Sequence, residues 1–463
     1  MTGPSLNTNY IPMKKILYCI FCAFLLLSIA SCKDGFLDVK PKGVIIPEKL
    51  SDYESLLNSL TMMQTFPSAL LYNTDDYYVE YAPIERSTAA NMYFWRQEAD
   101  VNDEVSPAIW GQLYRVIYDA NVIIKNAMHT NGESEQRKKE VLGEALLVRS
   151  DAYFSLLTAF AKAYDPTTAG TDPGLPLITS NDVTETAPQR SRLKATLDTI
   201  LNNAVQAAND LPLTNINRYR GTKAAAYGFL ARVYLYIGDY PNVDKYANLA
   251  LQTNHQLIDY NTITNKNGIP VSDLNPEILW QRACEEFILP TQMLYSDNLK
   301  AQFDVTDPLK SNDLRYVFLT TSNSKGISRN SPPGRTNFGV TFPELYLSVA
   351  EVAARSGQLN KAMDLVNKIR MVRIKKTAYQ PLTASDGEAA LAIVLAERRR
   401  ELVFGGLRWM DMKRLDKEGR MPEVQRINRR TGEVLATLKP HSKAYTLQIP
   451  GRVRKFNPNM DIN

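Results

Sequence analysis

The sequence predicts a mainly α-helical protein built from helix pairs, with long irregular loops and little strand. The first observation behind this prediction is that apolar side chains recur at helical spacing in several long segments. The second is an internal repeat of a helix pair, and the third is a long irregular segment between its two copies. From the periodicity we expect helices over residues 51–71, 106–128, 137–163 and 193–211.

The internal repeat aligns residues 221–251 with residues 340–370 at an offset of 119 positions. A large side chain, a small side chain and a glycine recur at matching places: Tyr227 with Tyr346, Ala231 with Ala350, and Gly238 with Gly357. This order is typical of tetratricopeptide repeats, in which small residues let paired helices approach closely. The alternative is two unrelated helical hairpins. We expect residues 106–128 and 137–163 to form a further pair.

Residues 258–339, between the two copies, are rich in Asn, Ser, Asp, Pro and Gly. An irregular segment of this length inside a helical protein is usually functional or disordered. Aromatic and apolar residues recur throughout it, which argues against disorder. A shorter irregular segment, residues 75–96, contains several tyrosines. Trp280, within Glu-Ile-Leu-Trp-Gln, is expected in a buried strand.

The stretch from Ala396 to Leu415 begins as the end of a helix. Ser385 and Glu388 have the spacing of a capping box at the start of that helix. Gly405-Gly406 is expected to end it, because glycine adopts the left-handed cap without a Cβ penalty. A second amphipathic helix then follows, with Trp409 and Met412 on its apolar face and charged residues on the other.

Glu397 and Glu401 lie one helical turn apart, beside three consecutive arginines. If the helix is covered, these carboxylates must be tightly paired, because an unpaired buried charge is costly. The alternative is a catalytic carboxylate or a phosphate site. No metal or phosphate motif accompanies them, so we favour a structural ion network.

The N-terminal region has the pattern of a lipoprotein signal peptide. Met13 is the expected true start, Lys14-Lys15 form a basic region, and an apolar run continues to Ile29. Ile-Ala-Ser-Cys, ending at Cys32, is a lipobox, so residues 1–31 are expected to be removed and Cys32 acylated. The alternative is a plain secretory leader whose cleavage site happens to lie near a cysteine.

Composition and motifs exclude several functions. The formal charge is +5 over 463 residues, and removal of Lys14 and Lys15 lowers it by two, too little to indicate nucleic-acid binding. Three histidines, His129, His255 and His441, lie apart from one another and are expected on the surface. No hydrolase, nucleotide or dinucleotide motif occurs, so we expect no metal, no cofactor and no catalysis.

Other titratable groups give only weak catalytic signals. The acidic pairs Asp75-Asp76 and Glu285-Glu286 suggest a glycosidase at most faintly, since sequence does not give the separation of two carboxylates. Cys284 is the other cysteine expected to remain after cleavage, which excludes an intramolecular disulfide if Cys32 is acylated.

Two signatures at opposite ends of the chain resemble those of the SusD/RagB family. Its C-terminal pattern, E-R-R-x-E-L-x-x-E-G-x-R-W-x-D-L-x-R, is matched by Glu397, Arg398, Arg399, Glu401, Leu402, Gly406, Arg408, Trp409, Asp411 and Arg414. Gly405 stands where the family usually has glutamate, which puts one salt bridge in doubt. Residues 32–43, reading C-K-D-G-F-L-D-V-K-P-K-G, are similar to the start of mature family members.

The resemblance covers the mature chain and implies a single SusD-like domain over residues 32–463. Its helical repeat parts would be about 106–255 and 340–416, with a variable, loop-rich part at about 258–339. The family also implies a non-enzymatic nutrient-binding lipoprotein, exposed at the cell outer membrane. Its implied partner is a SusC-type TonB-dependent transporter.

Three functions remain open at this point. The first is a surface binder that delivers oligosaccharides to the transporter. The second is an oligopeptide binder of RagB type, and the third is a tetratricopeptide scaffold for protein interactions. The scaffold predicts an exposed concave helix face, whereas both binders predict a site on aromatic loops. The loops here are long and aromatic, which favours binding.

The segment 91–96 is the predicted ligand-binding site. Sugars present apolar C–H faces beside hydroxyls, so their sites combine flat aromatic rings with polar side chains. The segment offers Tyr93 and Trp95 as platforms, with Asn91 and Arg96 as hydrogen-bond partners. Tyr295 and Phe303 are added as possible contacts from the second irregular segment. The alternative for Trp95, and for its neighbour Phe94, is simple packing beneath the loop.

Overall fold

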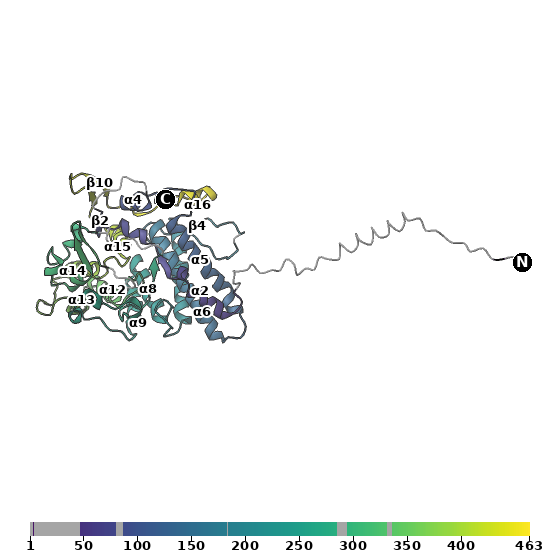
Figure 1. The fold of residues 1–463 in the computed structure, drawn as a ribbon, viewed down its shortest axis with the longest axis horizontal. Helices are drawn as coiled ribbons and strands as arrows, with labels where there is room; N and C mark the ends of the chain where they lie inside the picture. Colours follow the sequence, from purple (N-terminus) through teal and green to yellow (C-terminus); the bar gives the residue numbers. More distant parts are fainter. Residues whose placement is uncertain (1–2, 4–46, 80–86, 183, 285–293, 331–335) are drawn as a thin grey trace. The chain divides into compact units, whose positions relative to one another are not determined.

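The computed structural model describes residue 3 and residues 47–79, 87–182, 184–284, 294–330 and 336–463 (Figure 1). Lys49–Asn463 form one compact unit, and the account below concerns that unit. The predictions for the signal peptide, for Cys32, for the signature at 32–43 and for Glu285-Glu286 lie outside the described residues.

Helices dominate this unit, and three of the expected ones are confirmed. They are α5 (Ala108–Asn126), α6 (Glu135–Phe160) and α7 (Leu193–Asp210), with α6 packed against both of the others. The Ser134 hydroxyl caps α6 by accepting a hydrogen bond from the Arg137 amide. Because α6 has neighbours on several sides, most of its residues are buried rather than a single stripe.

The repeat is present as two helix pairs in the same register. The first pair is α8 (Lys223–Ile237) with α9 (Tyr240–Leu251), and the second is α12 (Phe342–Arg355) with α13 (Leu359–Arg373). Ala231 and Ala350, the matched small residues, are completely buried. Each pair turns at its matched glycine in the left-handed region, with φ of 78° at Gly238 and 73° at Gly357. The two pairs pack on each other through α9 and α12.

Replacement of Gly357 by alanine is expected to lower the free energy of unfolding by about 1 kcal/mol, because an L-residue at positive φ is strained. A Cβ there would meet no atom within 4 Å, so the effect isolates backbone conformation. Urea unfolding measures it, with Gly357→Asn as the control, since asparagine tolerates this region better. Equal stability of the alanine variant and the wild-type protein would contradict the turn geometry.

The expected helix over residues 51–71 is wrong. The chain instead forms α2 (Leu50–Leu57), α3 (Leu60–Met63), β1 (Gln64–Phe66) and the 3₁₀ helix η2 (Ser68–Asn73). The break has a local cause, because the Ser59 hydroxyl accepts a hydrogen bond from Met62 N and starts a new helix. The residues after α3 then leave the helical conformation and form β1, which pairs in parallel with β5 (Ala283–Cys284).

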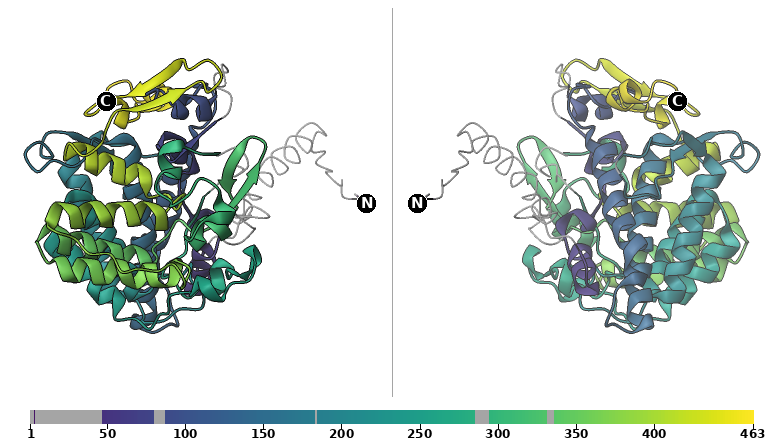
Figure 2. Two further views of the ribbon diagram at one scale, coloured as in Figure 1. Left: turned by 90° about the vertical axis from the view of Figure 1, so that its left-hand side faces the viewer. Right: turned by 90° about the vertical axis from the view of Figure 1, so that its right-hand side faces the viewer.

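Strands are short and connect segments that are distant in sequence. One sheet has the order β2-β6-β8-β7, and the β9–β10 hairpin lies beside α4 (Figures 1 and 2). The remaining strands are β2 (Tyr77–Tyr78), β3 (Pro173–Pro176), β4 (Arg190–Arg192), β6 (Leu294–Tyr295), β7 (Thr320–Asn323), β8 (Gly326–Arg329), β9 (Val424–Ile427) and β10 (Val434–Leu438). The short helices are α4 (Thr88–Tyr93), α10 (Asp297–Lys300), α11 (Leu314–Phe318) and α16 (Gly451–Phe456), and the further 3₁₀ turns are η3 (Ala127–His129), η4 (Tyr260–Thr262), η5 (Lys266–Gly268), η6 (Ser272–Leu274), η8 (Pro308–Lys310) and η9 (Lys443–Tyr445).

Two predictions about single residues need correction. Trp280 is fully buried, as expected, but lies outside the named strands, with its amide donating to Val340 O. His255 is half-buried rather than on the surface: its ring stacks on Phe342 at 3.9 Å and hydrogen-bonds the Tyr346 hydroxyl at 2.8 Å. In both cases a tertiary partner that is distant in sequence decided the outcome.

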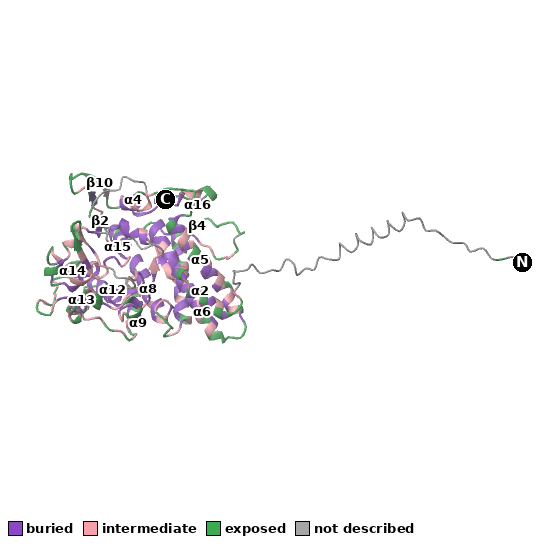
Figure 3. Ribbon diagram, in the orientation of Figure 1, coloured by how far each residue is buried: buried purple, intermediate pink, exposed green. Residues whose placement is uncertain are grey.

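The C-terminal helices differ from expectation at both ends of the first helix and on one face of the second. The first helix ends at Glu401, before Gly405-Gly406, which was expected to end it. Helix α14 (Gly387–Glu401) is capped by Asp386, whose carboxylate accepts from Ala389 N, and not by Ser385. Helix α15 (Arg408–Lys417) has no solvated polar face, since Trp409–Asp416 are all buried (Figure 3). Its charged residues are satisfied internally; Arg414, for example, forks onto Glu351.

Lys413 on α15 is fully buried and donates to the carbonyls of Thr158 and Ala161 at the end of α6. Burial lowers the pKa of its ammonium group from 10.5 to about 7. Between these two values the unfolded chain holds a proton that the folded chain lacks, so stability rises with pH and is lost as pH falls toward 7. The free energy of unfolding of the wild-type protein should therefore rise relative to that of Lys413→Met between pH 7 and 9, by at most about 1.4 kcal/mol per pH unit.

Urea unfolding of both proteins at pH 7, 8 and 9 measures this gain. Lys417→Met, at the half-exposed end of the same helix, is the control and should show no such trend. A stability difference between wild type and Lys413→Met that is independent of pH would contradict the shifted pKa.

Candidate functional site

The candidate site begins where α4 ends. Ser87 caps the start of this helix, and Arg96 N donates to Asn91 O while Trp95 N donates to Met92 O at its end. This pair of bonds is the Schellman motif, which needs a left-handed residue that is usually glycine. Here that residue is Trp95, with φ of 53°. A bulky residue in this conformation is strained, and such strain gathers at functional sites.

Arg426 on β9 holds Trp95 in place. Its guanidinium lies between the Tyr93 ring at 4.1 Å and the Trp95 ring at 4.2 Å. It also donates to four backbone carbonyls, those of Tyr72, Thr74, Tyr77 and Tyr93, at 2.9 to 3.0 Å. The Trp95 indole N–H donates to Asn73 O at 2.8 Å. The backbone at residues 72–77 and the end of α4 are therefore held by one cation from the far end of the chain.

A hollow of about 810 Å³ lies next to this support. Its two walls are the loop after α4 and the turn η9, and Gln97 joins them by donating to the carbonyls of Lys443 and Thr446. The Gln97 carbonyl in turn accepts from Gln448 N. The lining residues are mostly polar: Asn91, Trp95, Arg96, Gln97, Glu98, Asp100, Val101, Ser442, Lys443 and Ala444. The volume falls within the range of small-molecule sites.

Several charges in the hollow are open to a ligand. Arg96 is exposed, donates one hydrogen bond to Asn91 Oδ1 at 2.9 Å and lies over the Phe94 ring. Within the described part of the chain, neither Arg96 nor Lys443 has a carboxylate partner. Asp100 likewise has no cationic partner there; burial raises the pKa of its carboxyl, which outweighs the lowering by a hydrogen bond from the Ala108 amide, and the charges of Asp103 and Glu98 raise it further.

Three of the six predicted ligand residues, Asn91, Trp95 and Arg96, line this hollow. The rings expected as platforms are covered in this conformation, since Tyr93 is 3% exposed and Trp95 is 4% exposed. Tyr295 and Phe303 are buried in the same core as Tyr93 and Trp95, where they pack with Tyr316 and the Phe303 and Tyr316 rings stack at 4.2 Å. Ligand contact by these residues remains a prediction, and the structure places Tyr295 and Phe303 outside the residues that line the hollow.

Sequence reasoning missed Asp100, Lys443 and Arg426. Asp100 carries a usable signal, because it follows the aromatic segment within four residues of Arg96. Lys443 and Arg426 carry none, because only the folded chain brings them beside residues more than 300 positions earlier.

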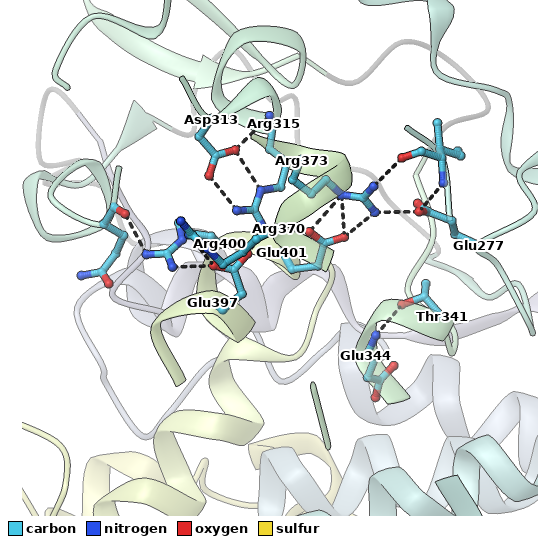
Figure 4. Close-up of polar contacts among 12 residues, drawn as sticks. Glu277, Asp313, Arg315, Thr341, Glu344, Arg370, Arg373, Glu397, Arg400 and Glu401 are labelled. Carbon is cyan, nitrogen blue, oxygen red and sulfur yellow. Dashed lines mark hydrogen bonds and ion pairs between the residues drawn. The ribbon is translucent and has the colours of Figure 1, made fainter. Parts of the chain in front are cut away.

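The Glu397–Glu401 cluster is a structural ion network, as the sequence indicated (Figure 4). Arg315 contacts Glu397 and Glu401, each at 2.7 Å, and Arg373 joins Glu401 to Glu277 at 2.8 and 2.7 Å. Burial raises the pKa of Glu397, but the charges of Arg315 and Arg400 outweigh it and lower that pKa to about 2. These carboxylates are committed to arginines, which argues against a catalytic or phosphate role.

Asp75 and Asp76 are also paired with arginines. Arg408 forks onto Asp75 at 2.6 and 2.8 Å, and Arg399 contacts Asp76 at 2.8 Å. Burial opposes ionisation of Asp75, yet the charges of Arg408 and Arg399 hold its pKa below the ordinary value. Among the described residues, no group of His, Cys, Asp and Glu side chains has the arrangement of a metal site. No described helix is both long and apolar enough to span a membrane.

Comparison with known proteins gives two family matches. Residues 35–235 match a SusD-like family described as starch-binding and associating with the outer membrane, and residues 323–462 match the SusD family. SusD-like protein P2 of Formosa agariphila is 25% identical over an alignment covering 87% of this chain and 91% of that protein. SusD-like protein P25 of the same organism is 24% identical and covers 58% and 51%.

Solved structures share the fold. A SusD superfamily protein from Bacteroides thetaiotaomicron VPI-5482 has a TM-score of 0.72 at 19% identity, covering 90% of this chain and 99% of that one. A SusD-like carbohydrate binding protein from Bacteroides vulgatus ATCC 8482 has a TM-score of 0.67 at 18% identity, covering 89% and 98%. The two family matches span most of the chain; the second contains the C-terminal signature and the whole second copy of the repeat, and the first ends within α8. Sequence signatures, helix pairs and fold agree, and the chain belongs to the SusD/RagB family of outer-membrane-associated, carbohydrate- and nutrient-binding proteins.

Proposed function

We propose that this protein is a lipid-anchored cell-surface protein that binds an oligosaccharide and delivers it to a TonB-dependent outer-membrane transporter. The observation that carries the proposal is the hollow beside Trp95, with its open polar groups on a rigid support. The carbohydrate-binding description of one structural neighbour and the starch-binding description of one matching family support the same class of ligand.

The chemistry of the hollow suits a saccharide. Sugar hydroxyls donate to carboxylates and accept from guanidinium and ammonium groups, and Asp100, Arg96 and Lys443 provide both kinds of partner without competing ion pairs. Val101 and Ala444 provide apolar surface for the C–H faces of a sugar ring. Sites of this kind bind through several hydrogen bonds at once, so loss of two partners has a large effect.

A glycan array beside a peptide-mixture pull-down tests the proposal, with the double variant Arg96→Ala/Asp100→Ala compared with wild type. Wild type is expected to bind glycans, and the double variant is expected to lose that binding while keeping its melting temperature. Arg430→Ala, an exposed arginine on the β9–β10 hairpin, is the control. Peptide binding alone would favour the RagB-type alternative, and capture of folded proteins alone would favour a tetratricopeptide scaffold.

Cys32→Ala is expected to release the protein from membranes into a soluble fraction. Attached acyl chains contribute about 0.8 kcal/mol per buried methylene, so two or three chains give stable anchoring. Fractionation followed by a carbonate wash measures the change, with Cys284→Ala, the half-buried cysteine near β1, as the control. Sedimentation of the Cys32 variant with washed membranes would rule out this anchor.

The proposed partner is a SusC-type barrel that the helix pairs would contact. Tethering the binder beside the transporter raises the effective concentration of captured ligand at its mouth without tight affinity. Affinity purification from native membranes in mild detergent should recover the transporter together with the protein. Recovery of the protein alone would count against the pairing.

A further inference from the structure

The charges around the hollow fall into two groups. Two acids of this region are paired with bases of α16: the lining residue Glu98 pairs with Arg454, and Glu104, which does not line the hollow, pairs with Lys455, each at 2.8 Å. The lining residues Arg96, Lys443 and Asp100 form no ion pair within the described part of the chain. The lining therefore carries two cations and one carboxylate that are not in an ion pair.

Arg96 is held ready for a ligand rather than free to move. One end of its guanidinium is fixed by the bond to Asn91 Oδ1, whose amide nitrogen is itself fixed by Ala99 O at 3.1 Å. The Phe94 ring lies 5.4 Å below the guanidinium carbon. A guanidinium has five N–H donors and the bond to Asn91 occupies one of them, so most of the donors of Arg96 remain available to a ligand. A guanidinium held in one orientation recognises a carboxylate or a sulfate by two parallel, charge-assisted hydrogen bonds.

We infer that the hollow selects a saccharide that carries an anionic group, either a uronate carboxylate or a sulfate ester. This inference rests on the proposed function, because it specifies the ligand of the same site. The anionic group contacts Arg96 and Lys443, and the ring hydroxyls donate to Asp100, which follows Arg96 by four residues on the loop after α4. A neutral sugar would offer both cations only hydroxyl acceptors, whereas an anionic group forms the stronger charge-assisted hydrogen bonds.

Asp100 sets the orientation of the ligand. A single carboxylate repels the anionic group and accepts from hydroxyls, so the sugar is expected to enter with its charge toward Lys443 and Arg96. Asp103 and Glu98 add negative charge near Asp100. A hollow that offers two cations and one carboxylate discriminates by both charge and hydroxyl arrangement.

The test uses paired probes that differ in charge alone. Tetra-galacturonate and tetra-mannuronate are each titrated beside their carboxyl-reduced neutral counterparts, and a sulfated tetra-galactoside is titrated beside its desulfated form. At least one anionic member should bind at least about tenfold more tightly than its neutral partner, as expected for charge-assisted hydrogen bonds. The preference should shrink as salt is raised, because screening weakens contacts between solvent-accessible charges.

Variants locate the effect. Arg96→Gln and Lys443→Gln should each reduce binding of the anionic probe several-fold and leave the neutral probe nearly unchanged, while Arg430→Gln changes neither. A preference within a uronate pair indicates a uronate ligand, and a preference within the sulfated pair indicates a sulfate ester. Equal binding of charged and neutral members, or binding of none of the pairs, overturns the inference. The proposed function survives that result if other glycans bind and Arg96→Ala/Asp100→Ala abolishes their binding, and fails if no glycan binds at all.

Discussion

Replacement of Arg315 by methionine is expected to lower the free energy of unfolding by about 3–5 kcal/mol, as removal of one partner from a buried ion network does. The Arg315 side chain is 2% exposed and contacts three carboxylates, those of Asp313, Glu397 and Glu401. Asp313 and Arg315 flank the start of α11 in the irregular segment, whereas both glutamates lie on α14. The variant therefore leaves buried carboxylates short of positive charge and detaches a loop segment from the helices.

Urea unfolding at neutral pH measures this loss. Arg115→Met is the matched control, because Arg115 pairs with Asp119 at 3.4 Å while its side chain is 67% exposed. Exposed pairs of this kind contribute about 1 kcal/mol or less. A loss below 1 kcal/mol for Arg315→Met would mean that the network is not a structural element of the fold.

Replacement of Arg426 by methionine is expected to cost about 4 kcal/mol or more, since each buried group that loses its partner costs about 1–3 kcal/mol. Four backbone carbonyls lose their donor, and the rings of Tyr93 and Trp95 lose the cation between them. The losses share one side chain and are not fully additive. Ligand binding should also fall, because Trp95 and the loop that follows it lose their support.

Arg426→Lys is the informative companion variant. Lysine keeps the charge but lacks the planar fork that reaches four carbonyls, so it should recover only part of the stability. Arg430→Met, in the turn of the same hairpin, should behave as wild type. Urea unfolding and glycan binding are both measured. Normal stability of Arg426→Met would contradict the central place of this cation in the site.

Local patterns in the sequence predict the mainly helical fold class and the main helices. Apolar periodicity located α5, α6 and α7, and the repeated glycines marked the turns at Gly238 and Gly357. The failures come from long-range contacts. The expected helix over 51–71 breaks where β1 pairs with β5, more than 200 residues away, and α15 loses its polar face because its charges find buried partners.

The candidate site was predicted in part. Asn91, Trp95 and Arg96 line the hollow, because residue type alone marks aromatic and polar groups on a loop. Burial of the Trp95 ring follows from its positive φ and from Arg426, and neither has a local signal in the sequence. Tyr295 and Phe303 were chosen for ring type as well, but stacking with Tyr316 places them in a core.

A crystal structure of the mature protein with a bound oligosaccharide tests the central claim most directly. We expect the sugar in the hollow between the loop after α4 and η9, with its groups within hydrogen-bond distance of Arg96, Asp100 and Lys443. A sugar bound on another face of the molecule, with the hollow empty, would contradict the account.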